Sequence, residues 1–66
     1  MRVKIKMNRF GHLIVTDPKT GKDIYLQLES DIEALLMDLS RSKRKDILNG
    51  WDVTANIDST WLDSAW

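Results

Sequence analysis

The chain has 66 residues, with ten basic side chains, ten acidic side chains and a formal net charge of zero. This length predicts one small domain over residues 1–66, which buries a smaller fraction of its surface than a domain of about 100 to 150 residues. The chain has no cysteine, which excludes a disulfide, and because it has a single histidine a structural zinc would have to be built from carboxylates. No apolar run approaches the roughly 18 residues that are needed to cross a bilayer.

The first part of the chain has the pattern of three antiparallel strands. Apolar and basic residues alternate over residues 2–7, which predicts a strand with one buried face. A signal peptide would be continuously hydrophobic there, so we expect a cytoplasmic location. Further strands are predicted over 12–16 and 23–28, with Leu28 on the buried face. The segments 8–11 and 17–22 carry turn residues, so the three strands should form a meander.

A helical region is predicted over residues 31–49. Ser30 and Glu33 have the spacing of a capping box, in which each side chain satisfies a free amide of the first turn. The apolar stripe thins over 40–45 before Asn49-Gly50 offers a stop, which leaves open one kinked helix or two. Helical spacing places four apolar residues on one face: Ile32, Leu35, Leu36 and Leu39.

Alternation returns over residues 51–57, which predicts a fourth strand joining the sheet, with Trp51 packed in register with Val53. Residues 59–66 could form a helical turn or stay mobile. Trp61 and Trp66 lie in this acidic end and could belong to the core or to an interface with a partner or a second copy. The expected fold class is therefore α+β, a three-stranded antiparallel meander packed on one or two helices.

No arrangement for catalysis is visible in the sequence. His12 is the only imidazole, and a strand start is more often a surface position than the place of a general base. Thr20-Gly21-Lys22 lacks the upstream glycine of a phosphate-binding loop, and Asp23 follows the lysine instead of serine or threonine. The carboxylates are dispersed along the predicted elements. We therefore expect no enzyme activity, no cofactor and no metal site.

The charges are sorted along the chain although they sum to zero. Residues 1–22 carry six basic and one acidic side chain, 23–40 carry five acidic ones, 41–46 carry four basic and one acidic, and 47–66 carry three acidic ones. Such sorting can make one surface basic and another acidic. We expect the outer face of the meander to be basic and to contain an aromatic ring, with these residues sharing it: Arg2, Lys4, Lys6, Tyr25, Gln27 and either His12 or Thr16.

A basic sheet face can bind a phosphate backbone, and its aromatic ring can stack on a base. Alternatively, the lysines keep a small sheet soluble and block edge pairing. The basic run over residues 40–45 could likewise dock on nucleic acid or on an acidic partner, or form a solvated helix face. The predicted nucleic-acid-binding residues are Arg2, Lys4, Lys6, Lys19, Lys22, Tyr25, Arg41, Lys43, Arg44 and Lys45.

A meander with the hairpin Asp17-Pro18-Lys19-Thr20-Gly21-Lys22, followed by a helix, resembles the arm-type DNA-binding domains of phage integrases and related plant DNA-binding domains. The resemblance covers roughly residues 3–48 and implies a sheet that binds DNA. The chain departs from that pattern in two respects: the first half of its helix is acidic, and the tryptophan-containing C-terminal strand has no counterpart.

The function we favour from the sequence is a small non-enzymatic regulator or inhibitor of the kind that mobile elements encode. It would bind an unidentified protein through the acidic helix and the tryptophan tail, with a homo-oligomer as a further possibility. Nucleic-acid binding through the basic face is the alternative. The predicted protein-interaction residues are Asp31, Glu33, Asp38, Trp61 and Trp66.

Overall fold

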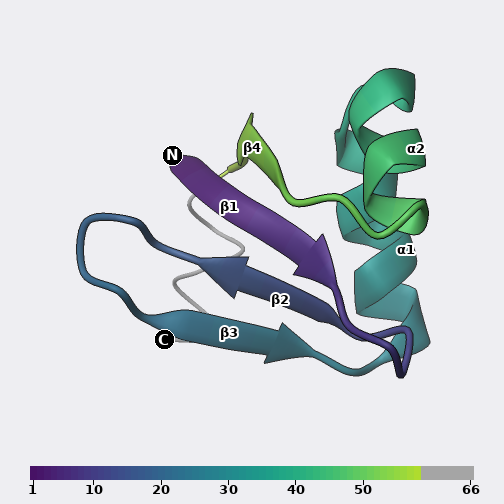
Figure 1. The fold of residues 1–66 in the computed structure, drawn as a ribbon, viewed down its shortest axis with the longest axis horizontal. Coiled ribbons are helices and arrows are strands. Elements are labelled where there is room, and N and C mark those ends of the chain that lie inside the picture. Colours follow the sequence, from purple (N-terminus) through teal and green to yellow (C-terminus); the bar gives the residue numbers. More distant parts are fainter. Residues whose placement is uncertain (59–66) are drawn as a thin grey trace.

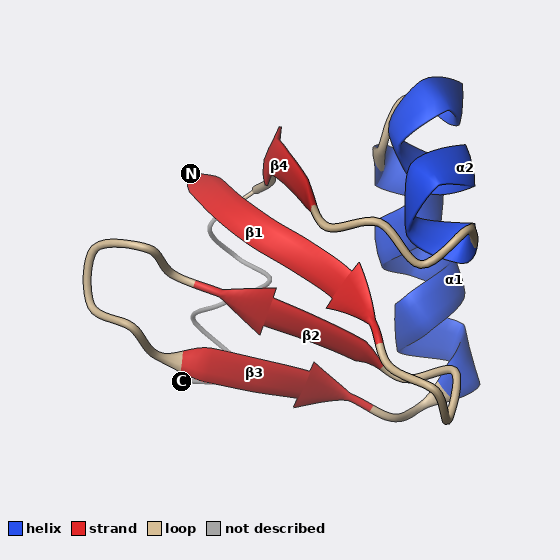
Figure 2. Cartoon of the chain, viewed as in Figure 1, coloured by secondary structure: helices blue, strands red, loops and turns tan. Residues whose placement is uncertain are grey.

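A computed structural model describes residues 1–58 of the chain. It contains, in chain order, β1 (Arg2–Met7), β2 (Leu13–Thr16), β3 (Asp23–Leu26), α1 (Glu29–Asp38), α2 (Arg41–Leu48) and β4 (Val53–Asn56). The four strands form one antiparallel sheet and the two helices lie against one face of it (Figures 1 and 2), so the predicted α+β class is confirmed. The predicted turn over 59–66, with Trp61 and Trp66, lies outside the described residues.

The strand order is β3-β2-β1-β4. The predicted meander therefore exists, and the fourth strand joins it beside β1. Helix α1 contacts β3, whereas α2 contacts β1 and β4. The two helices thus carry the chain from one edge of the sheet to the other, as the ribbon shows (Figure 1).

Both hairpin turns of the meander are stabilised by a side-chain oxygen. The Asn8 carboxamide oxygen accepts the N–H groups of Phe10 and His12, at 2.9 and 3.0 Å. In the second turn the buried carboxylate of Asp17 accepts the N–H of Lys19 at 2.9 Å. Such local bonds explain why asparagine and aspartate favour turns.

One face of the sheet is buried against the helices. Since strand side chains alternate between faces, each strand contributes every second residue to this core. Leu28 was predicted to face the core and does not: β3 ends two residues before it, and its side chain is exposed. The core contains Val3, Ile5, Leu13, Val15, Ile24, Ile32, Leu35, Leu39, Ile47, Val53, Ala55 and Ile57.

The helical region is two helices, which settles the alternative left open by the sequence. Leu39 and Ser40 are extended between them, and the Ser40 hydroxyl caps α2 by accepting the N–H of Lys43 at 3.3 Å. The capping box predicted at Ser30 was wrong. Helix α1 starts at Glu29, which places Ser30 inside the first turn, and Leu28 occupies the cap position without a side-chain hydrogen bond.

The C-terminus of α2 explains why Trp51 is not in the core. The N–H groups of Trp51 and Gly50 donate to the carbonyls of Asp46 and Ile47, at 2.9 and 3.0 Å, while Gly50 has a φ of 90°. This Schellman arrangement places Trp51 just past the helix end and before β4. The ring is 68% exposed, so its predicted packing with Val53 was wrong.

Candidate nucleic-acid interface

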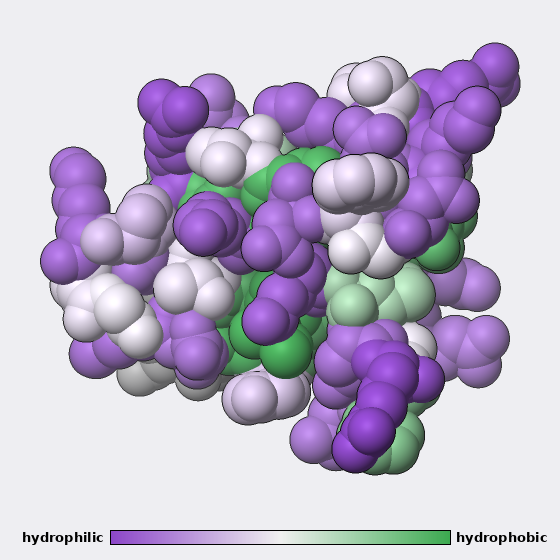
Figure 3. Space-filling view, viewed as in Figure 1, coloured by the Kyte–Doolittle hydropathy of each residue, from purple (hydrophilic) through white to green (hydrophobic). Residues whose placement is uncertain are grey.

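The sheet face opposite the helices carries most of the predicted nucleic-acid-binding residues of the strands. The register pairs Lys6 with Ile14 and Ile14 with Tyr25, so these three side chains form one row. Figure 3 views this side of the molecule, where hydrophilic side chains surround a green apolar strip. We call this surface the open face, and it comprises Arg2, Lys4, Lys6, Ile14, Thr16, Asp23, Tyr25, Thr54 and Asn56.

The structure confirms that the basic residues of β1 and an aromatic ring share the open face. Arg2, Lys4 and Lys6 are all exposed, and Tyr25 is 57% exposed. Thr16 belongs to this face as well, because it lies opposite Lys4. A phosphate backbone could approach the Arg2 guanidinium and the two lysine ammonium groups without any rearrangement of the sheet.

Gln27 and His12, which were also expected on the outer face of the meander, lie outside the sheet. Gln27 is exposed but follows the end of β3. His12 belongs to the first turn, where it is half-buried and its ring centroid lies 6.4 Å from that of Phe10. His12 therefore has a structural place in the hairpin.

Acidic groups also lie on or beside the open face, in addition to the basic and aromatic residues expected there. Asp23 lies opposite Thr16, and the Thr16 hydroxyl donates to its carboxylate at 2.7 Å. Asp52 immediately precedes β4, and continuing the β1–β4 register by one residue places it opposite Lys6. The alternation over 51–57 already indicated that Asp52 faces away from the core, but only the strand order brings it beside Lys6.

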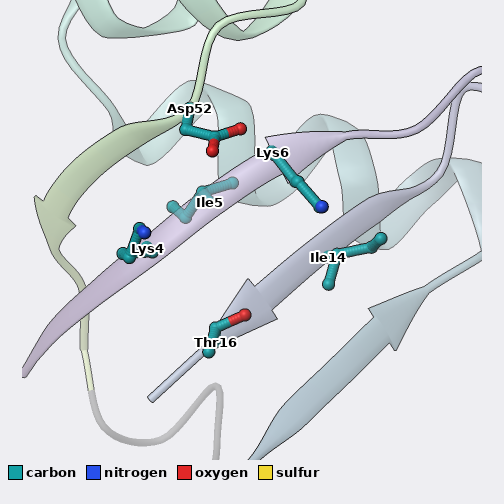
Figure 4. A pocket seen from close by; sticks show the side chains of 6 residues that line it. All are labelled: Lys4, Ile5, Lys6, Ile14, Thr16 and Asp52. Atoms are coloured by element: carbon teal, nitrogen blue, oxygen red, sulfur yellow. The ribbon is translucent and has the colours of Figure 1, made fainter. Parts of the chain in front are cut away.

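A shallow hollow of about 100 Å³ lies at the centre of the open face (Figure 4). We call it the central hollow. The Lys4 and Lys6 ammonium groups and the Asp52 carboxylate line it together with the half-buried side chain of Ile14, so the site offers donors, acceptors and a small nonpolar contact surface. Its lining residues are Lys4, Ile5, Lys6, Ile14, Thr16 and Asp52.

The basic run of α2 is not part of the open face, because α2 belongs to the helical layer. Lys43 Nζ donates to the main-chain oxygen of Thr54 at 2.7 Å. Met1 and Ile57 exchange both main-chain hydrogen bonds at 2.8 Å, so by alternation the carbonyl of Thr54 points out of the sheet edge. Lys43 thus covers one polar group of an edge strand.

The other members of the predicted basic set differ in exposure and position. Arg41 and Lys45 are exposed on α2, whereas Arg44 is half-buried. Lys19 and Lys22 are exposed in the loop between β2 and β3, at the end of the sheet away from the helices (Figure 1). The structure therefore distributes the basic residues over three places, of which the open face holds Arg2 and the β1 lysines.

The predicted acidic surface lies on α1. Asp31 is half-buried, and Glu33 and Asp38 are exposed. Glu29 lies in the first turn of α1, and all charged side chains of this helix are acidic. Acidic residues near the start of a helix are stabilised by the helix dipole, and this explains the presence of Glu29 and Asp31 in the first turn.

Residues 1–58 contain no group of three or more histidine, cysteine, aspartate or glutamate side chains that could hold a metal ion. Among the same residues, neither helix is long and apolar enough to cross a membrane.

The arrangement defines a small α+β protein with a four-stranded antiparallel sheet, one face of which is covered by two helices. Within residues 1–58 no element covers the other face, which carries three basic side chains among polar, apolar and acidic ones. Comparisons with protein-family models, with curated proteins and with solved structures found no match for this chain.

Proposed function

We propose that the protein is a small non-enzymatic binding module whose open face binds nucleic acid. The observation that carries this proposal is the register of the sheet, which puts Lys4 and Lys6 on the same exposed face as Tyr25. From the sequence we favoured protein binding, a hypothesis that depended largely on Trp61 and Trp66. These two residues lie outside the described residues. A cytoplasmic location fits this proposal.

The proposal has a simple physical basis. Lysines two residues apart on one strand point to the same side, so they can contact neighbouring phosphates of one backbone. Base stacking on an aromatic side chain is worth about 1–3 kcal/mol and does not depend strongly on sequence. The zero net charge of the chain does not prevent such binding, because the acidic side chains of α1 belong to the helical layer.

The test is the double substitution Lys4→Ala/Lys6→Ala. Both side chains are exposed, so the fold should be retained, and the affinity for a short single-stranded oligonucleotide at low salt should fall about tenfold or more. Loss of two phosphate contacts should also reduce the slope of log affinity against log salt concentration by about 1.4. Fluorescence anisotropy across a salt series measures both quantities.

The matched control is Arg41→Ala/Lys45→Ala, which removes the same charge from exposed positions of α2. This variant should bind nearly as well as the wild type, apart from a small long-range effect. An equal loss in both variants would show that the open face is not the site, and no binding of any oligonucleotide by the wild type at low salt would refute the proposed function.

A second candidate, protein binding through α1, is favoured by one observation. This helix carries only acidic charges, and Met37 on its outer side is 70% exposed. A basic partner would be attracted by the carboxylates and could bury the methionine, a residue enriched at interfaces. The predicted site comprises Asp31, Glu33 and Asp38, with Trp61 and Trp66 as further candidates.

Charge reversal separates this second candidate from the first. We expect Glu33→Lys to abolish retention of a protein partner in a pull-down from nuclease-treated native lysate. The control is Asp46→Lys, the same reversal at an exposed position of α2, which should leave retention unchanged. A partner retained equally by both variants would contradict binding through α1.

A further inference from the structure

The Asp52 carboxylate in the central hollow is not explained by phosphate binding. A negative charge beside Lys4 and Lys6 repels a phosphate and weakens purely electrostatic binding. A polyanion site alone would be improved by its removal. A ligand that presents hydrogen-bond donors as well as negative charge would use this carboxylate together with the lysines.

The charged groups around the hollow are available to a ligand. Within residues 1–58, the side chains of Lys4, Lys6 and Asp52 form no hydrogen bond or ion pair with one another or with other residues. Other polar groups of the sheet are engaged: Asp23 accepts from Thr16, and Lys43 donates to the Thr54 carbonyl. The hollow thus presents solvent-exposed donors and a solvent-exposed acceptor beside the half-buried side chain of Ile14.

The size of the hollow limits what it can hold. At about 100 Å³ it is smaller than the roughly 300–1,000 Å³ of a typical small-molecule site. It can receive the edge of a planar ring while the rest of the ligand lies over the sheet. Figure 4 shows the hollow open toward the viewer, with the lysine and Asp52 side chains at its rim and β1 beneath.

Building on the proposed function, we propose that the central hollow binds the Watson–Crick edge of an unpaired guanine. The two oxygens of the Asp52 carboxylate can accept the N1–H and one N2–H of guanine, the only common base with two adjacent donors of this kind. The Lys6 ammonium, on the neighbouring strand, can donate to guanine O6. In a duplex these atoms are engaged by cytosine, so the ligand is a single strand.

The rest of the open face fits the same ligand. Tyr25 is on β3, two strands away from Lys6 on β1 and three strands away from β4, which Asp52 precedes. At the usual strand spacing these separations are about 9.5 and 14 Å. A base stacked on Tyr25 and a guanine at Asp52 therefore belong to different nucleotides of one strand. The phosphates between them pass over β1, where Lys4 and Lys6 stand.

The test compares three short single-stranded oligothymidines that carry guanine, inosine or thymine at the central position. Inosine lacks the N2 amino group and removes one of the two donors. Wild-type protein should bind the guanine oligonucleotide about tenfold more tightly than the thymine one, with inosine between them. Asp52→Asn should abolish the difference between guanine and inosine while leaving binding of the thymine oligonucleotide equal or stronger.

The matched control is Asp23→Asn, which removes a carboxylate from the same face at a position already engaged by Thr16. It should retain the preference for guanine. A guanine preference that survives Asp52→Asn, or that is lost equally in Asp23→Asn, would overturn the inference. Binding without any base preference would overturn it and leave the proposed function standing, whereas no binding of any oligonucleotide would refute both.

Discussion

Ile5→Ala is expected to reduce the free energy of unfolding by about 2–5 kcal/mol, which is the range for truncating a fully buried aliphatic side chain. Ile5 is 0% exposed and lies between Val15 and Val53 in the register of the sheet. A chain of this length has a total stability of about 3–10 kcal/mol. Truncation at this position should therefore remove about half of the total stability, which urea denaturation followed by circular dichroism measures.

The control for Ile5→Ala is the same substitution at Ile14. Ile14 lies on the neighbouring strand but on the open face, where it is half-buried. Its truncation removes fewer contacts and leaves no closed cavity, so the loss should be no more than about half as large. Equal losses at the two positions would contradict the assignment of the buried face.

Ile47→Ala is expected to have the second-largest effect, a loss of about 2–4 kcal/mol. Helix α2 has eight residues, too few to be stable in isolation, so its stability depends on packing. Ile47 is its one fully buried residue, at 0% exposure. Without it α2 should separate from β1 and β4, which hydrogen exchange of the α2 amides would detect together with the lower urea midpoint.

The adjacent residue supplies the control. Leu48 is a leucine of equal size one position along the same helix, but it is 59% exposed. Leu48→Ala should change the free energy of unfolding by about 0.5 kcal/mol or less, since alanine is also the better helix former. A larger loss at Leu48 than at Ile47 would mean that α2 packs through its other side.

The sequence predicted the parts of this fold that depend on short-range signals. Alternation of apolar and polar residues identified β1, β3 and β4, the β-branched and apolar content of residues 12–16 identified β2, and the apolar stripe identified α1. The errors lie at element ends. A helix that starts one residue before Ser30 removes its capping role, and a strand that starts at Val53 leaves Trp51 outside the sheet. Boundaries are decided by tertiary packing that a local pattern does not contain.

The basic character of the outer sheet face also followed from the sequence alone. Residues two apart on a strand must share a face, so Lys4 and Lys6 were placed together once Ile5 was assigned to the core. The grouping of β1 with Tyr25 needed only that the meander be antiparallel. By contrast, the basic run of α2 could not be located relative to the sheet, and the structure places it in the helical layer.

The sequence by itself therefore determined an α+β chain whose meander has one apolar and one basic face. Only the tertiary structure decided that β4 lies beside β1, because strand order depends on contacts between residues far apart in the chain. That order brings Asp52 to Lys6, across more than two thirds of the sequence, and so creates the central hollow. The site proposed for guanine follows from this pairing, since no local pattern relates a carboxylate after the last helix to the lysines of the first strand.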